Sequence, residues 1–183
     1  MSWLRGDWYF TGYQCEKIPK KNGRGMTRIY TYSGEYYGYG EEGKESGKVK
    51  RGYALFGAWI LISYLLAAFS NATGNKIPYI GVTFLFALIP LFYFCLGVGY
   101  GMMQKDRMTY RGYYGSYKRI LRSAKAMLVI LVIPCALEII FLINHYEYYL
   151  QGNEIRFLAY MLFCMAGLIC FLYFMKKKTC QIL

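Results

Sequence analysis

The sequence predicts an all-α membrane protein: a four-helix transmembrane bundle made of two helical hairpins, with a small cytoplasmic β-meander at the N-terminus. Three observations support this prediction. Apolar residues make up 56% of the 183 residues and charged residues only 17%, whereas soluble domains contain about 25% charged residues. The apolar residues are gathered in four long runs. The basic residues are gathered in alternate segments between and around those runs.

Each apolar run is long enough to cross a bilayer. Positions 52–75 and 77–104 contain no charged residue, and Glu138 is the only one within 126–146. The fourth run, 157–175, also contains none. Crossing ~30 Å of hydrocarbon takes ~20 residues of helix, and lipid leaves the helix as the only structure for such runs because every backbone amide must be bonded within its own segment. We therefore predict helices at 53–70, 78–100, 124–143 and 157–175.

The distribution of basic residues predicts which ends face the cytoplasm. Residues 1–52 contain ten Lys and Arg, residues 101–125 contain seven, and the tail after Met175 contains three, whereas 71–77 and 144–156 contain one each. Because basic loops stay inside, we expect a multi-pass protein of the bacterial cytoplasmic membrane with both termini cytoplasmic. The net charge of +12 is then a collar that attracts anionic lipid headgroups, by ~1 kcal/mol per residue near the surface. Nucleic-acid binding is the alternative interpretation of this charge, and we do not adopt it.

Residues 1–40 are expected to form a two- or three-stranded meander. Segments 8–11 and 28–32 are rich in aromatic and β-branched residues, which suit strands, and the stretch 19–25 between them contains the Pro and Gly typical of turns. A sheet this small is marginal alone, so we expect it to lean on the membrane, the helix ends or a partner chain. Residues 41–52 are expected to be a charged tether to the first helix.

The cytoplasmic loop 101–123 repeats the Tyr-Gly pattern of the N-terminal segment and then becomes basic and amphipathic. The basic stretch is predicted to lie at the membrane interface. We expect the two tyrosine-rich segments either to pack together or to bind a protein partner. The candidate partner or lipid contacts are Tyr36, Tyr37, Tyr39, Arg111, Tyr113, Tyr114, Lys118, Arg119 and Arg122.

Two short segments have similar sequences at equivalent places in the two hairpins. Residues 74–77 (GNKI) precede the second helix, and residues 152–155 (GNEI) precede the fourth. Either a duplicated hairpin or a common turn sequence explains this similarity.

The basic cytoplasmic tail, 176–183, ends in Cys-Gln-Ile-Leu. This sequence matches a prenylation motif only in part, because Gln is not aliphatic. Whether Cys180 is modified therefore stays open.

Glu138 is the single acid inside a predicted span, one turn after Pro134. An ionisable residue in hydrocarbon costs several kcal/mol and marks a candidate functional site. It is either a proton or cation site, or a protonated group that bonds a Tyr hydroxyl or a carbonyl freed by Pro134 and so aligns the helices. Gly97 and Gly101 have a G-x-x-x-G spacing that allows close helix packing, or they mark a flexible helix end.

No catalytic residue, cofactor or metal site is predicted. The chain has one His and six Cys without a C-x-x-C pair, and it lacks the common enzyme motifs. The leading hypothesis is a small non-enzymatic accessory, assembly or regulatory subunit that binds another membrane protein or itself. The alternative is an oligomeric transporter or channel that uses Glu138, and a membrane-embedded enzyme is the third.

Overall fold

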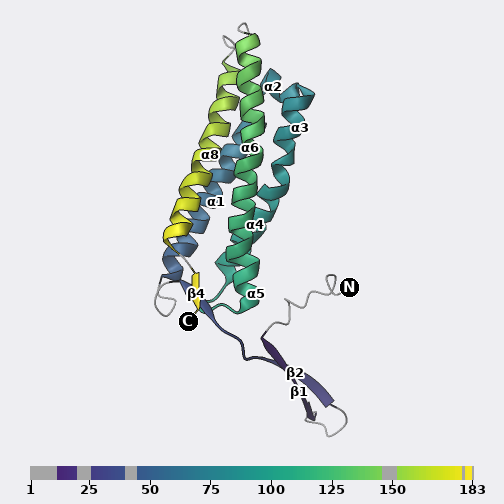
Figure 1. Ribbon diagram of the computed structural model, residues 1–183, viewed down its shortest axis with the longest axis vertical. Helices are drawn as coiled ribbons and strands as arrows, with labels where there is room; N and C mark the ends of the chain where they lie inside the picture. Colours follow the sequence, from purple (N-terminus) through teal and green to yellow (C-terminus); the bar gives the residue numbers. More distant parts are fainter. Residues whose placement is uncertain (1–11, 20–25, 40–44, 146–151, 179, 183) are drawn as a thin grey trace.

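A computed structural model describes residues 12–19, 26–39, 45–145, 152–178 and 180–182 of the chain. Four helical segments within these residues are long and apolar enough to cross a membrane, and they run side by side as one elongated bundle (Figure 1). Both ends of the described chain lie at the same end of this bundle, which we call the terminal end. The opposite end carries a short helix, α2 (Thr73–Lys76), and we call it the α2 end. The chain is thus a mostly helical, multi-pass membrane protein.

The four spans include all the long helices. The first is α1 (Ser46–Ala68). The second consists of α3 (Pro78–Phe86) and α4 (Leu88–Met103). The third begins with α5 (Tyr110–Tyr113), continues through the π-helical segment η3 (Tyr114–Lys118) and ends with α6 (Arg119–Asn144). The fourth is α8 (Asn153–Lys177).

The helices extend beyond the apolar runs that predicted them. Helix α1 begins at Ser46, so most of the segment expected to be a tether at 41–52 is its first two turns. The third span begins at Tyr110, so the second half of the segment expected to be the loop 101–123 is helical. Lys and Arg are good helix formers, and their long side chains can keep their charges in water. Hydropathy therefore marks the part of each helix that lies in hydrocarbon, not its end.

The second span is interrupted at Ala87, between α3 and α4. Pro90 lies in the first turn of α4, where its missing N–H is tolerated. It cannot donate to the carbonyl of Phe86, as a residue in a continuous helix would, and its ring crowds that carbonyl. The interruption therefore follows from a single residue of the sequence.

The strands form two separate two-stranded sheets. Strands β1 (Tyr13–Pro19) and β2 (Met26–Tyr32) pair as an antiparallel hairpin, which lies beyond the terminal end (Figure 1). Strand β3 (Tyr37–Tyr39) pairs instead with β4 (Cys180–Ile182) from the other end of the chain. The expected meander is therefore a hairpin, and β3 does not join it. The strand expected at 8–11 lies outside the described residues.

Strand β3 is bonded on two sides, which explains why it leaves the hairpin. Besides its pairing with β4, the N–H of Tyr37 donates to the carbonyl of Met108 at 2.8 Å and the N–H of Met108 donates back at 2.8 Å. Burial raises the pKa of the Tyr39 hydroxyl and raises the pKa of the Cys180 thiol in β4 to about 12. At neutral pH this thiol is therefore protonated, which makes it a poor nucleophile.

Aromatic rings and glycines pack the interior of the bundle. Tyr64 stacks on Phe84 with ring centroids 4.5 Å apart, and its hydroxyl donates to the Phe84 carbonyl at 2.9 Å. Neighbouring side chains approach the helix backbone closely at glycines, which have no Cβ. A Cβ at Gly97 would lie 2.7 Å from Ile120, and one at Gly101 would lie 2.9 Å from the Tyr53 ring. The G-x-x-x-G pair thus packs α4 within its own chain.

Residues from the two ends of the chain are joined at the terminal end. The hydroxyls of Tyr39 and Tyr53 are 2.5 Å apart and buried. Lys178, just after α8, donates to both carboxylate oxygens of Glu45, just before α1, at 2.8 Å. The Lys178 hydrogen bond lowers the pKa of Glu45, so this ion pair persists at neutral pH and is lost as pH falls through that lowered pKa.

We expect Tyr39→Phe to destabilise the folded protein by about 1–2 kcal/mol, because the buried Tyr53 hydroxyl loses its partner. Thermal unfolding in detergent measures this change. Tyr36→Phe is the matched control, since Tyr36 is 41% exposed. Equal effects of the two substitutions would contradict a special role for the buried pair.

Candidate functional site

Two fully buried glutamates lie at the α2 end of the bundle. Glu138 comes from α6 and Glu154 from the first turn of α8, and both are 0% exposed. They are close enough for their charges to interact. The start of a helix favours a negative charge, which suits the position of Glu154. Paired buried carboxyls are the most unusual chemical feature within the spans, so we take them as the candidate site.

Glu154 joins the two helical hairpins. Its carboxylate accepts hydrogen bonds from the backbone N–H of Thr73 at 2.5 Å and of Gly74 at 3.1 Å. These residues begin α2, whose N-cap residue, Ala72, has no side chain that could accept such a bond. Orphan N–H groups at a helix start need an acceptor. A side chain from the fourth span therefore caps a helix that precedes the second span.

Glu138 has no such bonds. Neither of its carboxylate oxygens has a hydrogen-bond partner among the described residues. The carboxylate packs directly on Gly74, where an added Cβ would overlap its oxygen Oε2. Gly74 is therefore required by its contact with Glu138, not by its backbone conformation.

Glu138 lies toward the C-terminal end of α6. It is six residues from the end of α6 at Asn144, which corresponds to ~9 Å along the axis. Glu154 is a polar neighbour of Glu138. Neither a Tyr hydroxyl nor the carbonyl freed by Pro134, the partners suggested for a structural role, bonds the carboxylate among the described residues. Pro134 itself is buried within α6.

Glu154 belongs to the candidate site but was not among the residues predicted from the sequence. The fourth helix was expected to begin at 157, which left Glu154 in a loop outside the membrane. The helix begins at Asn153, after Gly152 in a left-handed conformation with φ of 71°. Gly followed by Asn and Glu is compatible with a helix start, since Gly serves as an N-cap and an acid suits the first turn. The two similar segments 74–77 and 152–155 contact each other through Gly74 and Glu154.

The tyrosine-rich segments pack against each other at the terminal end. Tyr37 of β3 stacks on Tyr113 of α5 at 4.5 Å between centroids, and Tyr113 stacks on Tyr117 at 5.4 Å. Tyr39 is only 4% exposed, so it belongs to the core and not to a contact surface. Tyr36 is 41% exposed and is the N-terminal candidate that remains available for contact.

Basic side chains surround this tyrosine stack. The ammonium of Lys118 lies 5.4 Å from the ring centre of Tyr113 and 5.6 Å from that of Tyr114. Arg122 lies 5.3 Å from the Tyr114 ring and donates to its hydroxyl at 2.9 Å. Arg119 begins α6 and lines a surface groove beside α4. Arg111 is half-buried in α5.

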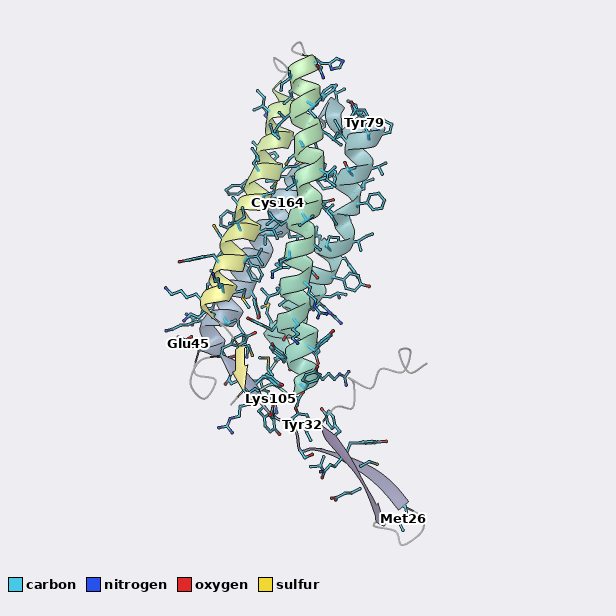
Figure 2. All side chains as sticks on the ribbon, in the orientation of Figure 1. Met26, Tyr32, Glu45, Tyr79, Lys105 and Cys164 are labelled. Carbon is cyan, nitrogen blue, oxygen red and sulfur yellow. The ribbon has the colours of Figure 1, made fainter. Side chains whose placement is uncertain are left out.

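The β1–β2 hairpin contacts the bundle close to its base. Figure 2 shows Tyr32 at the base, near Lys105, and Met26 at the far end. The Tyr32 hydroxyl accepts a hydrogen bond from the backbone N–H of Tyr110 at 3.0 Å. Met26 is 67% exposed and Tyr30 is 50% exposed. Within the described parts of the chain, neither strand pairs on its outer edge.

Neither a cluster of metal ligands nor a similarity to a known protein indicates what the candidate site does. Among the described residues, no three His, Cys, Asp or Glu side chains come together as metal ligands would. The chain matches no protein-family model, no curated protein and no solved structure. The carboxyl pair and the hairpin are therefore the two candidate functional features.

We expect Gly74→Ala to destabilise the protein by about 1–3 kcal/mol, because the new methyl group would force the Glu138 carboxylate to move. Unfolding in detergent measures the loss. Gly99→Ala is the control, since a Cβ there meets nothing within 4 Å.

The double variant Gly74→Ala/Glu138→Ala tests whether the loss arises from this contact. Removing the carboxylate should make Gly74→Ala nearly neutral in a double-mutant cycle. Additive effects of the two substitutions would contradict the contact.

Proposed function

We propose that the chain is a small non-enzymatic membrane subunit that binds a partner protein on the cytoplasmic side through the β1–β2 hairpin. The observation that supports the proposal is the position of this hairpin beyond the end of the bundle (Figure 1), with neither outer edge paired to another strand among the described residues. A two-stranded hairpin is marginal alone in water, and an open strand edge is a template for another chain.

The chemistry of the hairpin favours a protein as its partner. Cys15 pairs with Tyr30 in the antiparallel register, so their side chains share one face, and the Met26 side chain at the far end belongs to the same face. These three side chains are exposed, and the register places the basic pair Lys17–Arg28 between them. Tyr, Met and Arg are the residue types enriched in protein interfaces. A strand from the partner would pair with the free edge and cover these side chains.

The location of the hairpin argues against the bilayer as its contact. The hairpin lies beyond the helix ends and points away from the spans (Figure 2). Lys118 and Arg122 lie over tyrosine rings at the terminal end of the spans, and basic side chains next to a membrane span attract anionic lipid headgroups. In this proposal the helical bundle anchors the chain in the membrane, and the hairpin binds the partner protein.

We expect Tyr30→Ser to reduce recovery of the partner about tenfold, which corresponds to ~1.4 kcal/mol. Affinity purification of the full chain in mild detergent, followed by quantitative mass spectrometry, measures recovery. Gln14→Ser is the control, because Gln14 is exposed and lies on the opposite face of the hairpin. The proposal fails if the wild-type chain retains only copies of itself, or if both substitutions act equally.

The buried carboxyls favour a second candidate, an oligomeric proton or cation transporter that uses Glu138. Its carboxylate lacks a hydrogen-bond partner among the described residues and lies beside Glu154. An acid buried in a span is a recognised feature of proton pathways. The interior of the bundle is packed with rings such as Tyr64, Phe84 and Phe171. A pathway between copies of the chain would therefore require the α2 end to open and expose Glu138, which is 0% exposed.

Glu138→Gln distinguishes the two candidates, because Gln keeps the size of the side chain but cannot exchange a proton. For an anchoring subunit, we expect no proton flux from the wild type or the variant, unchanged partner recovery and a stability change of about 1 kcal/mol. Vesicles with the chain reconstituted and a pH-sensitive dye inside measure the flux. A flux that is lost in Glu138→Gln and kept in Glu35→Gln, an exposed acid, would establish the transporter instead.

A further inference from the structure

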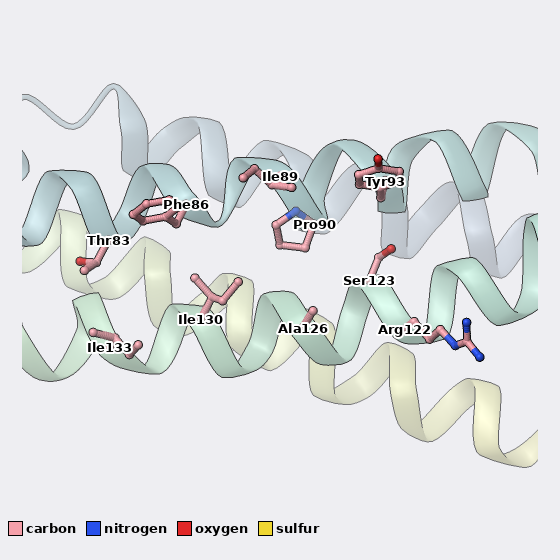
Figure 3. A pocket seen from close by; sticks show the side chains of 10 residues that line it. All are labelled: Thr83, Phe86, Ile89, Pro90, Tyr93, Arg122, Ser123, Ala126, Ile130 and Ile133. Atoms are coloured by element: carbon pink, nitrogen blue, oxygen red, sulfur yellow. The ribbon is translucent and has the colours of Figure 1, made fainter. Parts of the chain in front are cut away.

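We propose that a groove between the second and third spans binds one acyl chain of an anionic phospholipid, with the lipid phosphate held by Arg122. The groove has a volume of about 560 Å³, within the roughly 300–1,000 Å³ of ligand sites. Phe86, Ile89 and Pro90 line one wall, and Ala126, Ile130 and Ile133 line the other (Figure 3).

The interruption of the second span shapes this groove. Helix α3 ends at Phe86 and α4 begins at Leu88, with Pro90 in its first turn. Across the groove, the side chain of Ala126 is only a methyl group (Figure 3). The proline and the alanine together leave space that larger side chains would fill.

The length of the groove matches one leaflet of a membrane. The wall on α6 runs from Arg122 to Ile133, which are eleven positions apart on a continuous helix. At 1.5 Å per residue this is ~16 Å, about half of the ~30 Å hydrocarbon thickness. The spans lie in hydrocarbon, and Ile89 and Ile133 are more than half exposed. The natural occupant is therefore a lipid chain from one leaflet.

The charged side chain that lines the groove, Arg122, lies at one end beside two polar side chains. Figure 3 shows Tyr93, Ser123 and Arg122 together at this end, opposite Thr83. Apolar side chains occupy the length between them. A groove that is apolar along its length and basic at one end is complementary to an amphiphile with an anionic headgroup.

Arg122 is held in place but is not neutralised. One guanidinium nitrogen donates to the Tyr114 hydroxyl at 2.9 Å, and the described residues provide Arg122 with no acidic partner. A guanidinium has five N–H donors, so donors remain for a phosphate, which Arg binds in a bidentate manner.

The surrounding sequence favours a headgroup with net negative charge. No acidic residue occurs between Asp106 and Glu138, whereas this stretch contains six Lys and Arg. Lys118 and Arg119 lie one turn before Arg122. The cation of a zwitterionic headgroup would be repelled by these basic side chains, whereas an anionic headgroup carries no cation. We therefore assign the site to an anionic phospholipid, independently of the partner that the hairpin binds.

Native mass spectrometry of the full chain in mild detergent tests this site. The added probes are phosphatidylglycerol and phosphatidylcholine with identical acyl chains. We expect the first lipid to bind at least about tenfold more tightly to the wild type. Arg122→Gln should remove most of that preference, and Lys105→Gln, which removes an exposed positive charge at the same end, should keep it.

Ala126→Phe tests whether the acyl chain lies in the groove. Ala126 is exposed, so a Phe fills the groove without disturbing the core, and binding of both lipids should fall severalfold. A circular dichroism spectrum equal to that of the wild type verifies folding.

Three outcomes would overturn the proposal. Equal binding of the two lipids would exclude a headgroup site. Equal effects of Arg122→Gln and Lys105→Gln would reduce the preference to the general basic collar. A change of oligomeric state in Ala126→Phe, with lipid binding unaltered, would show that the groove receives a helix of a second copy.

Discussion

The hydrocarbon of a membrane provides no hydrogen bonds, and this constraint governs how the polar groups of the chain are arranged. Serine hydroxyl groups within the spans donate hydrogen bonds to nearby backbone carbonyls. Ser63 donates to the carbonyl of Trp59 at 2.7 Å, and Ser116 donates to that of Gly112 at 2.6 Å. Against this background, a buried carboxylate such as that of Glu138, which has no partner among the described residues, requires a separate explanation. A role in proton or cation binding and a role in packing against Gly74 are the two explanations that the geometry offers.

The same constraint moves the directed interactions to the ends of the bundle. At the α2 end, Glu154 bonds the backbone that begins α2 and so fixes one helical hairpin on the other. At the terminal end, the β3–β4 pairing and the Lys178–Glu45 ion pair join the beginning of the first span to the end of the fourth. Between the ends, the contacts are rings and glycines, which carry no charge and make few directed bonds. Helix packing in lipid has this character, because shape and close contact replace the hydrophobic effect as the source of affinity.

The sequence predicts the parts of the structure that depend on local composition. The four apolar runs predict the four spans because crossing hydrocarbon is a requirement on every residue of the run. The aromatic and β-branched residues near Tyr30 predict a strand for the same kind of reason. The pairing of β3 with Cys180–Ile182 is not predictable in this way, since it joins segments from opposite ends of the chain. Nor is the start of α1 at Ser46, because charged residues stop a hydropathy signal without stopping a helix.

The candidate site likewise contains one residue that the sequence predicts and others that only the tertiary structure identifies. Glu138 is evident from the sequence because an acid within an apolar run is rare. Its neighbour Glu154 is 16 positions further on, in a stretch that hydropathy assigns to a connection, and only the packing of α8 on α6 and α2 brings the two together. Gly74 carries no sequence signal of its own, since its requirement arises from a carboxylate 64 positions away. A single acid in a span is thus a useful indicator of a site, whereas the partners that decide its chemistry belong to the tertiary structure.

The features that support the two candidate functions lie at opposite ends of the bundle: the carboxyl pair at the α2 end, and the hairpin beyond the terminal end. Glu138 and Arg122 both lie on α6, 16 residues apart, which corresponds to ~24 Å along the helix axis. Coupling over such a distance requires an element with two discrete arrangements that both sites bias. The break at Ala87 is the natural place to look for one, because α3 and α4 meet there without a continuous hydrogen-bond ladder. It also forms one wall of the groove beside Arg122. A lipid in that groove would therefore contact the break in the second span, an element that could transmit a change from one end to the other.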